Sequence, residues 1–252
     1  YCTDVFFELG RDFIARHREE PFLCCITTNA PHSPFQVPGH YADLYRGQVP
    51  EERARFYGMI TCIDENVGRL RTWLEEEGLA ENTIFIFMTD NGTDGGCGVD
   101  GKSHFVTDGC NAGMRGKKSS PYEGGHRVPF FLRWPEGGLD KGRDIGTLCA
   151  NVDFVPTLLD LCGLGTPQGL RFDGVSLAPL LRGENLDSRI LVTDSQRVPH
   201  PQKWKDSCAM EGRWRLVNGA ELYDIAADPG QRRDAAADHP EVVGRLREGY
   251  ER

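Results

Sequence analysis

Two oxygen-bearing side chains, Asp90 and Asn91, stand next to each other directly after the apolar stretch "TIFIFMT" of residues 83–89. Carboxylate and amide oxygens are hard donors of the kind that calcium and magnesium prefer. A histidine in the second position would suit a transition metal better. Gly92 follows and would let the backbone turn, so that both side chains could reach one ion. The alternative is a simple Asx-type turn, because Asn-Gly is a strong turn signal.

A pair of lysines, Lys117 and Lys118, lies in the glycine-rich stretch "GMRGKKSSPYEGG" of residues 113–125. A lysine ammonium held over a substrate oxyanion stabilises negative charge, which makes this stretch a candidate anion clamp. The stretch has no apolar face, so a solvated basic loop is the alternative.

Two histidines are further candidates for the same chemistry. His32 lies in "APHSP", just past the apolar run of residues 22–27, where it could donate to an anion or protonate a leaving group. The alternative is an ordinary surface-loop histidine. His104 lies in the long loop of residues 92–125, where it would face either substrate or solvent.

The elements that must position these residues are predicted to be alternating helices and strands. Amphipathic spacing predicts a helix from Thr3 or Asp4 to about residue 20, one over residues 50–78, and one over residues 151–163. Apolar runs predict strands at 22–27, 83–89 and 128–134. This order predicts an α/β fold with a mainly parallel sheet covered by helices. Ligands bind such sheets at the carboxyl ends of the strands, where Asp90 stands.

The pattern changes after about residue 186. Short strand-like stretches alternate with turn signals at Glu211-Gly212 and Asn218-Gly219, and a last helix is predicted from about Pro240. We therefore predict two units, an α/β unit over residues 1–185 and a small antiparallel sheet with a helix over residues 186–252.

Composition excludes two classes of protein. The chain has 29 Lys and Arg against 38 Asp and Glu, a net charge of −9, which argues against a nucleic-acid partner. No stretch approaches the ~20 apolar residues of a membrane span. The nine cysteines include no CxxC pair, so a structural zinc site is not expected.

Seven ordered segments together resemble the formylglycine-dependent sulfatases of the alkaline-phosphatase-like superfamily. They are "NAPHSPFQVP", "GMITCIDENVGRL", "LAENTIFIFMTDNGT", "GMRGKKSSPYEGGHRVPFFLRWP", "NVDFVPTLLDLCG", "DGVSLAPLL" and "ELYDIAADPGQRRDAA". The resemblance spans almost the whole chain. It implies an α/β core with a small C-terminal antiparallel subdomain, and a periplasmic, secreted or lysosomal location.

The resemblance also implies roles for individual residues. Asp90 and Asn91 match the family's second pair of metal ligands, usually for calcium and less often for magnesium. Lys118, four residues before Tyr122, matches the lysine that contacts the sulfate, whereas Lys117 is one position off. His32 matches the histidine near the sulfate and the leaving group.

The family's nucleophile does not match anywhere in the chain. It derives from a Cys or Ser in a C/S-x-P/A-x-R motif, oxidised to formylglycine, and no cysteine or serine here has that context. We therefore expect these residues to be the carboxyl portion of a sulfatase, inactive by itself, with the nucleophile and the first metal-binding aspartates upstream.

Three functions remain open on the sequence. The first is a sulfuric-ester hydrolase acting on a sulfated carbohydrate or an aryl sulfate. The second is a phosphodiesterase or phosphonate monoester hydrolase relative, which Asn91 argues against because such relatives commonly carry Asp-His at this pair. The third is a non-catalytic chain that binds sulfated ligands or a partner.

Overall fold

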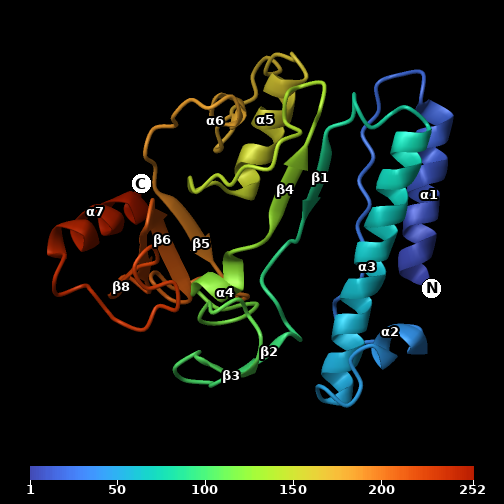
Figure 1. Cartoon of the computed structure of the whole chain (residues 1–252). Coiled ribbons are helices and arrows are strands. Elements are labelled where there is room, and N and C mark those ends of the chain that lie inside the picture. The colour runs from blue at the N-terminus through green and yellow to red at the C-terminus, as the bar shows by residue number, and fades with distance from the viewer.

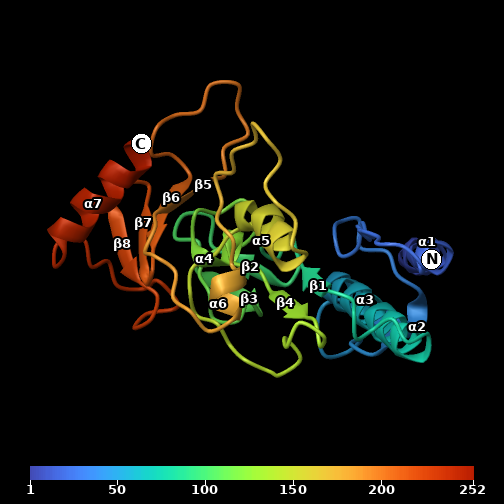
Figure 2. The ribbon, with the colours of Figure 1, turned by 90° about the horizontal axis from the view of Figure 1, so that it is seen from above.

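The computed structural model describes all residues from 1 to 252, and Figure 1 shows their course. Figure 2 shows the N-terminal helices and the C-terminal sheet at opposite ends of the molecule, with the middle elements between them. None of the helices combines the length and the apolar character that a membrane crossing needs.

The elements before residue 135 are α1 (Cys2–His17), α2 (Gly39–Asp43), α3 (Glu51–Glu76), β1 (Phe85–Met88), β2 (Cys97–Val99), β3 (Val106–Gly109), α4 (Glu123–His126) and β4 (Phe130–Arg133). The later elements are the short 3-10 helix η1 (Asn151–Asp153), α5 (Phe154–Leu161), α6 (Ala178–Leu181), β5 (Leu191–Asp194), β6 (Ser207–Glu211), β7 (Trp214–Val217), β8 (Glu221–Asp224) and α7 (Pro240–Glu251).

Helices α1 and α3 form the N-terminal layer. Both predicted helices form, and Ile14 of α1 packs against Leu70 and Leu74 of α3. Their apolar faces are only partly buried, since Leu9 and Ile60 are 58% and 43% exposed. Helix α3 begins after Pro50 with two glutamates in its first turn, where the helix dipole favours negative charge. It ends at Glu76. Gly78, two residues further on, has a φ of +69°, which allows Leu79 N–H to donate to the Leu74 carbonyl in a Schellman-type cap.

The strand predicted over residues 22–27 is not formed. The segment is extended, and its side chains alternate: Phe22, Cys24 and Ile26 pack toward α1 and α3, whereas Leu23 on the other face is 79% exposed. A strand requires a neighbour that exchanges backbone hydrogen bonds with it, and no segment of the structure lies in that position. The prediction of a run covered on both faces was therefore wrong.

The predicted parallel sheet is also absent. Strands β1 and β4 do form inside the predicted ranges, but they pair antiparallel, with Phe85 opposite Arg133 and Met88 opposite Phe130. Parallel neighbours need a crossover connection, usually a long helix. The connection here carries only the β2–β3 hairpin and the four-residue α4, which return the chain beside β1 in the opposite direction.

Strands β5 to β8 form one antiparallel sheet in sequence order. Helix α7 covers one face through Val242 and Leu246, and Tyr122 packs on the other face. Both predicted hairpins are present. In the second, Asn218 and Gly219 have φ values of +52° and +66°, the left-handed conformation that a type I′ turn requires at both central residues.

Candidate active site

The residues that follow β1 leave their side-chain oxygens free. Asp90 is exposed and Asn91 half-buried, and neither side chain makes a hydrogen bond or an ion pair; only the Asn91 backbone carbonyl is engaged, by the Thr89 hydroxyl at 3.2 Å. Free, hard oxygen donors suit a calcium ion. No three His, Cys, Asp or Glu side chains lie close enough to form a metal site. The donor types therefore fit calcium, but they supply only part of its usual six to eight ligands.

Glycines bring the end of β1 against the start of α4. Gly92 N–H donates to the Gly125 carbonyl at 3.0 Å, and a Cβ on Gly92 would lie only 1.8 Å from the Gly124 oxygen. Gly124 is equally constrained, since its own Cβ would lie 2.3 Å from the Gly116 oxygen. Close backbone approach, rather than a positive φ, is the reason for glycine at position 92.

The two lysines lie in a tight turn of residues 117–120, which we call the lysine turn. Ser120 N–H donates to the Lys117 carbonyl at 2.9 Å, and Ser119 adopts a φ of +68°. Lys118 N–H donates at 2.9 Å to the Thr93 carbonyl, two residues after Asn91. This bond places the backbone of Lys118 beside the loop that follows β1 and carries Asp90 and Asn91.

The two lysine side chains differ in what they contact. The Lys117 ammonium donates to the Asp94 carbonyl at 3.3 Å and lies 3.9 Å from the Asp94 carboxylate. Lys118 is half-buried as a residue, and its ammonium has no hydrogen-bond or ion-pair partner. Lys118 is therefore the lysine that is free to bind an anion.

His32 lies in the loop that follows the extended segment. Its Nδ1–H donates to the Ser33 carbonyl at 2.7 Å, because a carbonyl can only accept, and its Nε2 is left open on an exposed side chain. Phe35 of the same loop packs on Gly95, where a Cβ would lie 2.6 Å from the Phe35 ring. The His32 loop thus contacts the loop that carries Asp90 and Asn91.

His104 packs on Tyr122, with the ring centroids 5.4 Å apart. Its carbonyl accepts from Gly116 N–H at 2.9 Å, which joins it to the segment just before the lysine turn. The residue is half-buried and has a φ of +58°. His104 therefore belongs to the same loop assembly, but its ring contacts an aromatic residue of the loop and not the end of β1.

Sequence reasoning missed the buried arginines that hold the loop of residues 92–125 in place. Glu123 lies 3.4 Å from Arg127, its neighbour four residues along the chain, but the Arg127 side chain is 61% exposed. The closer partner of Glu123 is the buried Arg215 of β7, whose Nε donates at 2.5 Å. Arg215 lies 92 residues further along the chain. Its sequence signal was an arginine between apolar neighbours in a strand.

Asp153 is at the start of the predicted helix, as expected, but it is fully buried. It accepts from the Ala150 N–H at 2.8 Å and from the guanidinium of Arg189 at 2.6 Å. Burial alone would raise the pKa of Asp153, but the hydrogen bonds from Arg189 and from backbone amides outweigh it and lower the pKa.

Two family profiles match the chain. The sulfatase profile matches residues 1–164, and the profile described as "N-sulphoglucosamine sulphohydrolase, C-terminal" matches residues 117–248.

Individual proteins similar to this chain include two that are named as sulfatases. The chain is 33% identical over 171 residues to the uncharacterized sulfatase YdeN of Escherichia coli, covering 67% of this chain and 28% of the relative. It is 28% identical to an N-acetylgalactosamine-6-O-sulfatase of Bacteroides thetaiotaomicron, covering 98% of this chain and 50% of the relative. The fold superposes with a TM-score of 0.80 on the crystal structure of Ps i-CgsB in complex with k-i-k-neocarrahexaose, at 23% identity and covering 98% of this chain and 54% of that one. The chain thus spans half or less of the length of these two curated relatives.

Proposed function

This chain belongs to the sulfatase family, and on that premise we propose that the whole protein hydrolyses sulfuric esters and releases inorganic sulfate. The family match over residues 1–164 is the observation that carries this proposal. The arrangement of the lysine turn supports it, because an unpaired ammonium stands on a turn that is hydrogen-bonded to Thr93 in the loop after β1, two residues beyond Asn91.

Lys118 is assigned to bind the sulfate. A preorganised positive charge stabilises the negative charge that grows on sulfate oxygens during reaction. Its neighbour Lys117 is unsuited to this role because its ammonium is held by Asp94.

His32 is assigned to the leaving group. Its Nδ1–H is held by Ser33, so its Nε2 is the nitrogen available to deliver a proton to the departing alcohol oxygen. The rigid contact of Phe35 with Gly95 keeps this loop near the end of β1.

Asp90 and Asn91 are assigned to hold a calcium ion as part of its ligand shell. Bound calcium would stabilise charge on the sulfate oxygens, and a formylglycine supplied from outside these residues would act as the covalent nucleophile. The substrate class we propose is a sulfated carbohydrate or an aryl sulfate. It is supported by the similarity to proteins named N-acetylgalactosamine-6-O-sulfatase and Arylsulfatase J.

The two adjacent lysines provide the test. The whole protein, produced together with a formylglycine-generating enzyme, is assayed with a chromogenic aryl sulfate and calcium. Lys118→Ala should lower turnover by ~10²–10³, the usual cost of removing one charge-stabilising donor. The matched Lys117→Ala variant should retain most of the turnover. Equal effects of both substitutions would show that the sulfate is not bound by Lys118.

A further inference from the structure

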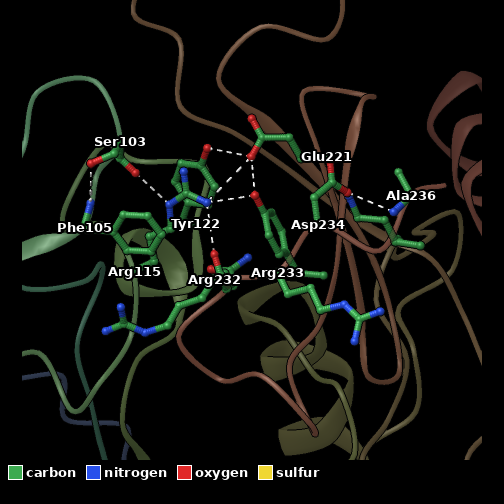
Figure 3. Close-up of polar contacts among 12 residues, drawn as sticks. Ser103, Phe105, Arg115, Tyr122, Glu221, Arg232, Arg233, Asp234 and Ala236 are labelled. Atoms are coloured by element: carbon green, nitrogen blue, oxygen red, sulfur yellow. Dashed lines mark hydrogen bonds and ion pairs between the residues drawn. The ribbon is translucent and has the colours of Figure 1, made fainter. Parts of the chain in front are cut away.

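One arginine that the proposed chemistry does not use is buried next to the lysine turn. Arg115 is 9% exposed, and its guanidinium lies 3.8 Å from the centroid of the Tyr122 ring and 4.4 Å from that of Phe105 (Figure 3). A guanidinium between two aromatic faces is held by stacking and cation–π attraction, which a lysine ammonium on a flexible stem does not reproduce.

The same guanidinium reaches the C-terminal sheet. It donates to the Tyr223 hydroxyl at 2.8 Å and to the Gln231 carbonyl at 3.1 Å, and its Nε donates to the Ser103 carbonyl at 2.7 Å. The Glu221 carboxylate lies 3.7 Å away. A buried charge of this kind is tolerated because it is paired with a carboxylate and makes three hydrogen bonds.

Both ends of the lysine turn are attached to Glu221 of β8. Arg115 precedes the turn and contacts Tyr223 and Glu221. Tyr122 follows the turn and donates to the Glu221 carboxylate at 3.0 Å. Burial, joined by the Glu221 charge, raises the pKa of Tyr122 to about 12, so the hydroxyl keeps the proton it donates.

We propose that Arg115 is a positioning residue that fixes the lysine turn to the C-terminal sheet and so holds Lys118 beside the loop that follows β1. The role assigned to Lys118 rests on the proposed function, whereas the attachment of the turn does not. Through this contact the C-terminal sheet, which carries none of the predicted site residues, determines where the anion-binding ammonium lies.

The test uses the whole protein with Arg115→Ala, Arg115→Lys and Tyr223→Phe. Arg213→Ala is the matched control, because Arg213 is an exposed arginine of the same sheet that pairs with Asp224. Hydrogen exchange measured by mass spectrometry reports the Lys118 and Ser120 amides, which are bonded to Thr93 and Lys117. Turnover of an aryl sulfate is measured on the same preparations.

Arg115→Ala should increase exchange in the peptide covering 116–121 about tenfold, as expected for local opening of a segment that has lost its anchor. Exchange in β6 and β7 should stay as in the wild type. kcat should fall about 10²-fold with a smaller change in KM, because misplacement of about 1 Å costs that much. Millimolar guanidinium should restore part of the kcat of Arg115→Ala by refilling the slot between Phe105 and Tyr122, and should not affect Arg213→Ala.

Unchanged exchange in 116–121, or an effect on kcat no larger than that of Arg213→Ala, would overturn the proposal. If Arg115→Ala does not fold, exchange in Arg115→Lys and Tyr223→Phe decides the question, with an increase confined to the lysine turn as the supporting result. If the wild-type protein hydrolyses no sulfate ester, the proposed function fails, and exchange alone decides whether Arg115 holds the turn.

Discussion

The β1–β4 pair has the more apolar sequence, with Arg133 as its only polar residue, yet it is much less buried than the β5–β8 sheet. Four of the five residues of β6 are buried, and Leu216 and Leu222 are fully inaccessible. None of the residues of β1 and β4 is fully buried, and Phe131 is 65% exposed. The difference shows that apolar sequence alone does not make a core, because burial also requires elements that cover each face.

The predicted chemistry belongs to the poorly covered region. Asp90, Asn91 and the lysine turn extend from β1 and its loops, whereas α7 and Tyr122 enclose the C-terminal sheet from both sides. We propose a boundary near residue 186 between these two units. Contacts of Arg115 and Glu123 connect the two units. Through these contacts the well-buried C-terminal unit holds in place the region that carries the predicted site.

The largest expected effect concerns the nucleophile, because the C/S-x-P/A-x-R motif occurs in neither region. Residues 1–252 expressed alone should show no turnover of an aryl sulfate in the presence of calcium. Lys118, His32 and the two proposed metal ligands are assigned only to binding and polarising the sulfate, and none of these roles forms the covalent intermediate. The comparison is with the whole protein matured by a formylglycine-generating enzyme. Turnover by residues 1–252 above that of their Lys118→Ala variant would reveal an unrecognised nucleophile.

The connection between the regions should be the most sensitive point for stability. Glu123→Gln leaves the buried Arg215 without its carboxylate, and breaking a buried pair in this way costs about 3–5 kcal/mol in the free energy of unfolding. Urea unfolding measures the change. Arg127→Ala removes only the exposed partner of Glu123 and should cost about 1 kcal/mol or less. Comparable losses in the two variants would mean that burial of the Arg215 pair is unimportant.

Replacing one large side chain in each region by alanine tests the difference in packing between the two regions. Leu216→Ala should lower the free energy of unfolding by about 2–5 kcal/mol, because it opens a cavity in a fully buried core. Phe131→Ala, in the exposed pair, should change it by no more than about 0.5 kcal/mol. Thermal and urea unfolding of both variants provide the test. A large loss for Phe131→Ala would show that β4 is covered in solution.

The smallest expected effect is a dependence on pH. The pKa of Asp153 is lowered in the folded protein below its unfolded value of about 3.9. Its contribution to stability is therefore fully present above about pH 4 and is lost as the pH falls through the folded pKa. Urea midpoints measured from about pH 6 to about pH 3 should fall more steeply for the wild type than for Asp153→Asn. Parallel curves would exclude Asp153 as a source of this slope.

Local signals in the sequence predicted a good part of the fold. Periodic apolar residues, Pro50 and Gly78 predicted α3, and Asn218-Gly219 predicted its hairpin, because each depends on residues that are close in the chain. The antiparallel direction of β4 relative to β1 was not predictable in this way. Helix and strand propensities do not specify whether a returning strand pairs parallel or antiparallel with an earlier one.

The residues of the candidate site also differ in whether the sequence could predict them. The choice of Lys118 over Lys117 came from a family pattern, and the Asp94 contact of Lys117 supplies an independent physical reason for it. Arg115 and Arg215 were not recognised, because their partners lie roughly a hundred residues away and a charged residue in a loop or strand is usually solvated. Only the folded contacts distinguish a buried arginine from a surface one.

The Arg115 contacts also have a consequence for protein synthesis. Tyr223 and Gln231 lie 108 and 116 residues after Arg115, so the ribosome must release almost the entire chain before the guanidinium finds its partners. The hairpins of the β5–β8 sheet, in contrast, close between near neighbours and can form quickly once they emerge. A nascent chain interrupted before Gln231 would therefore carry both lysines but would lack the anchor that gives their turn its place.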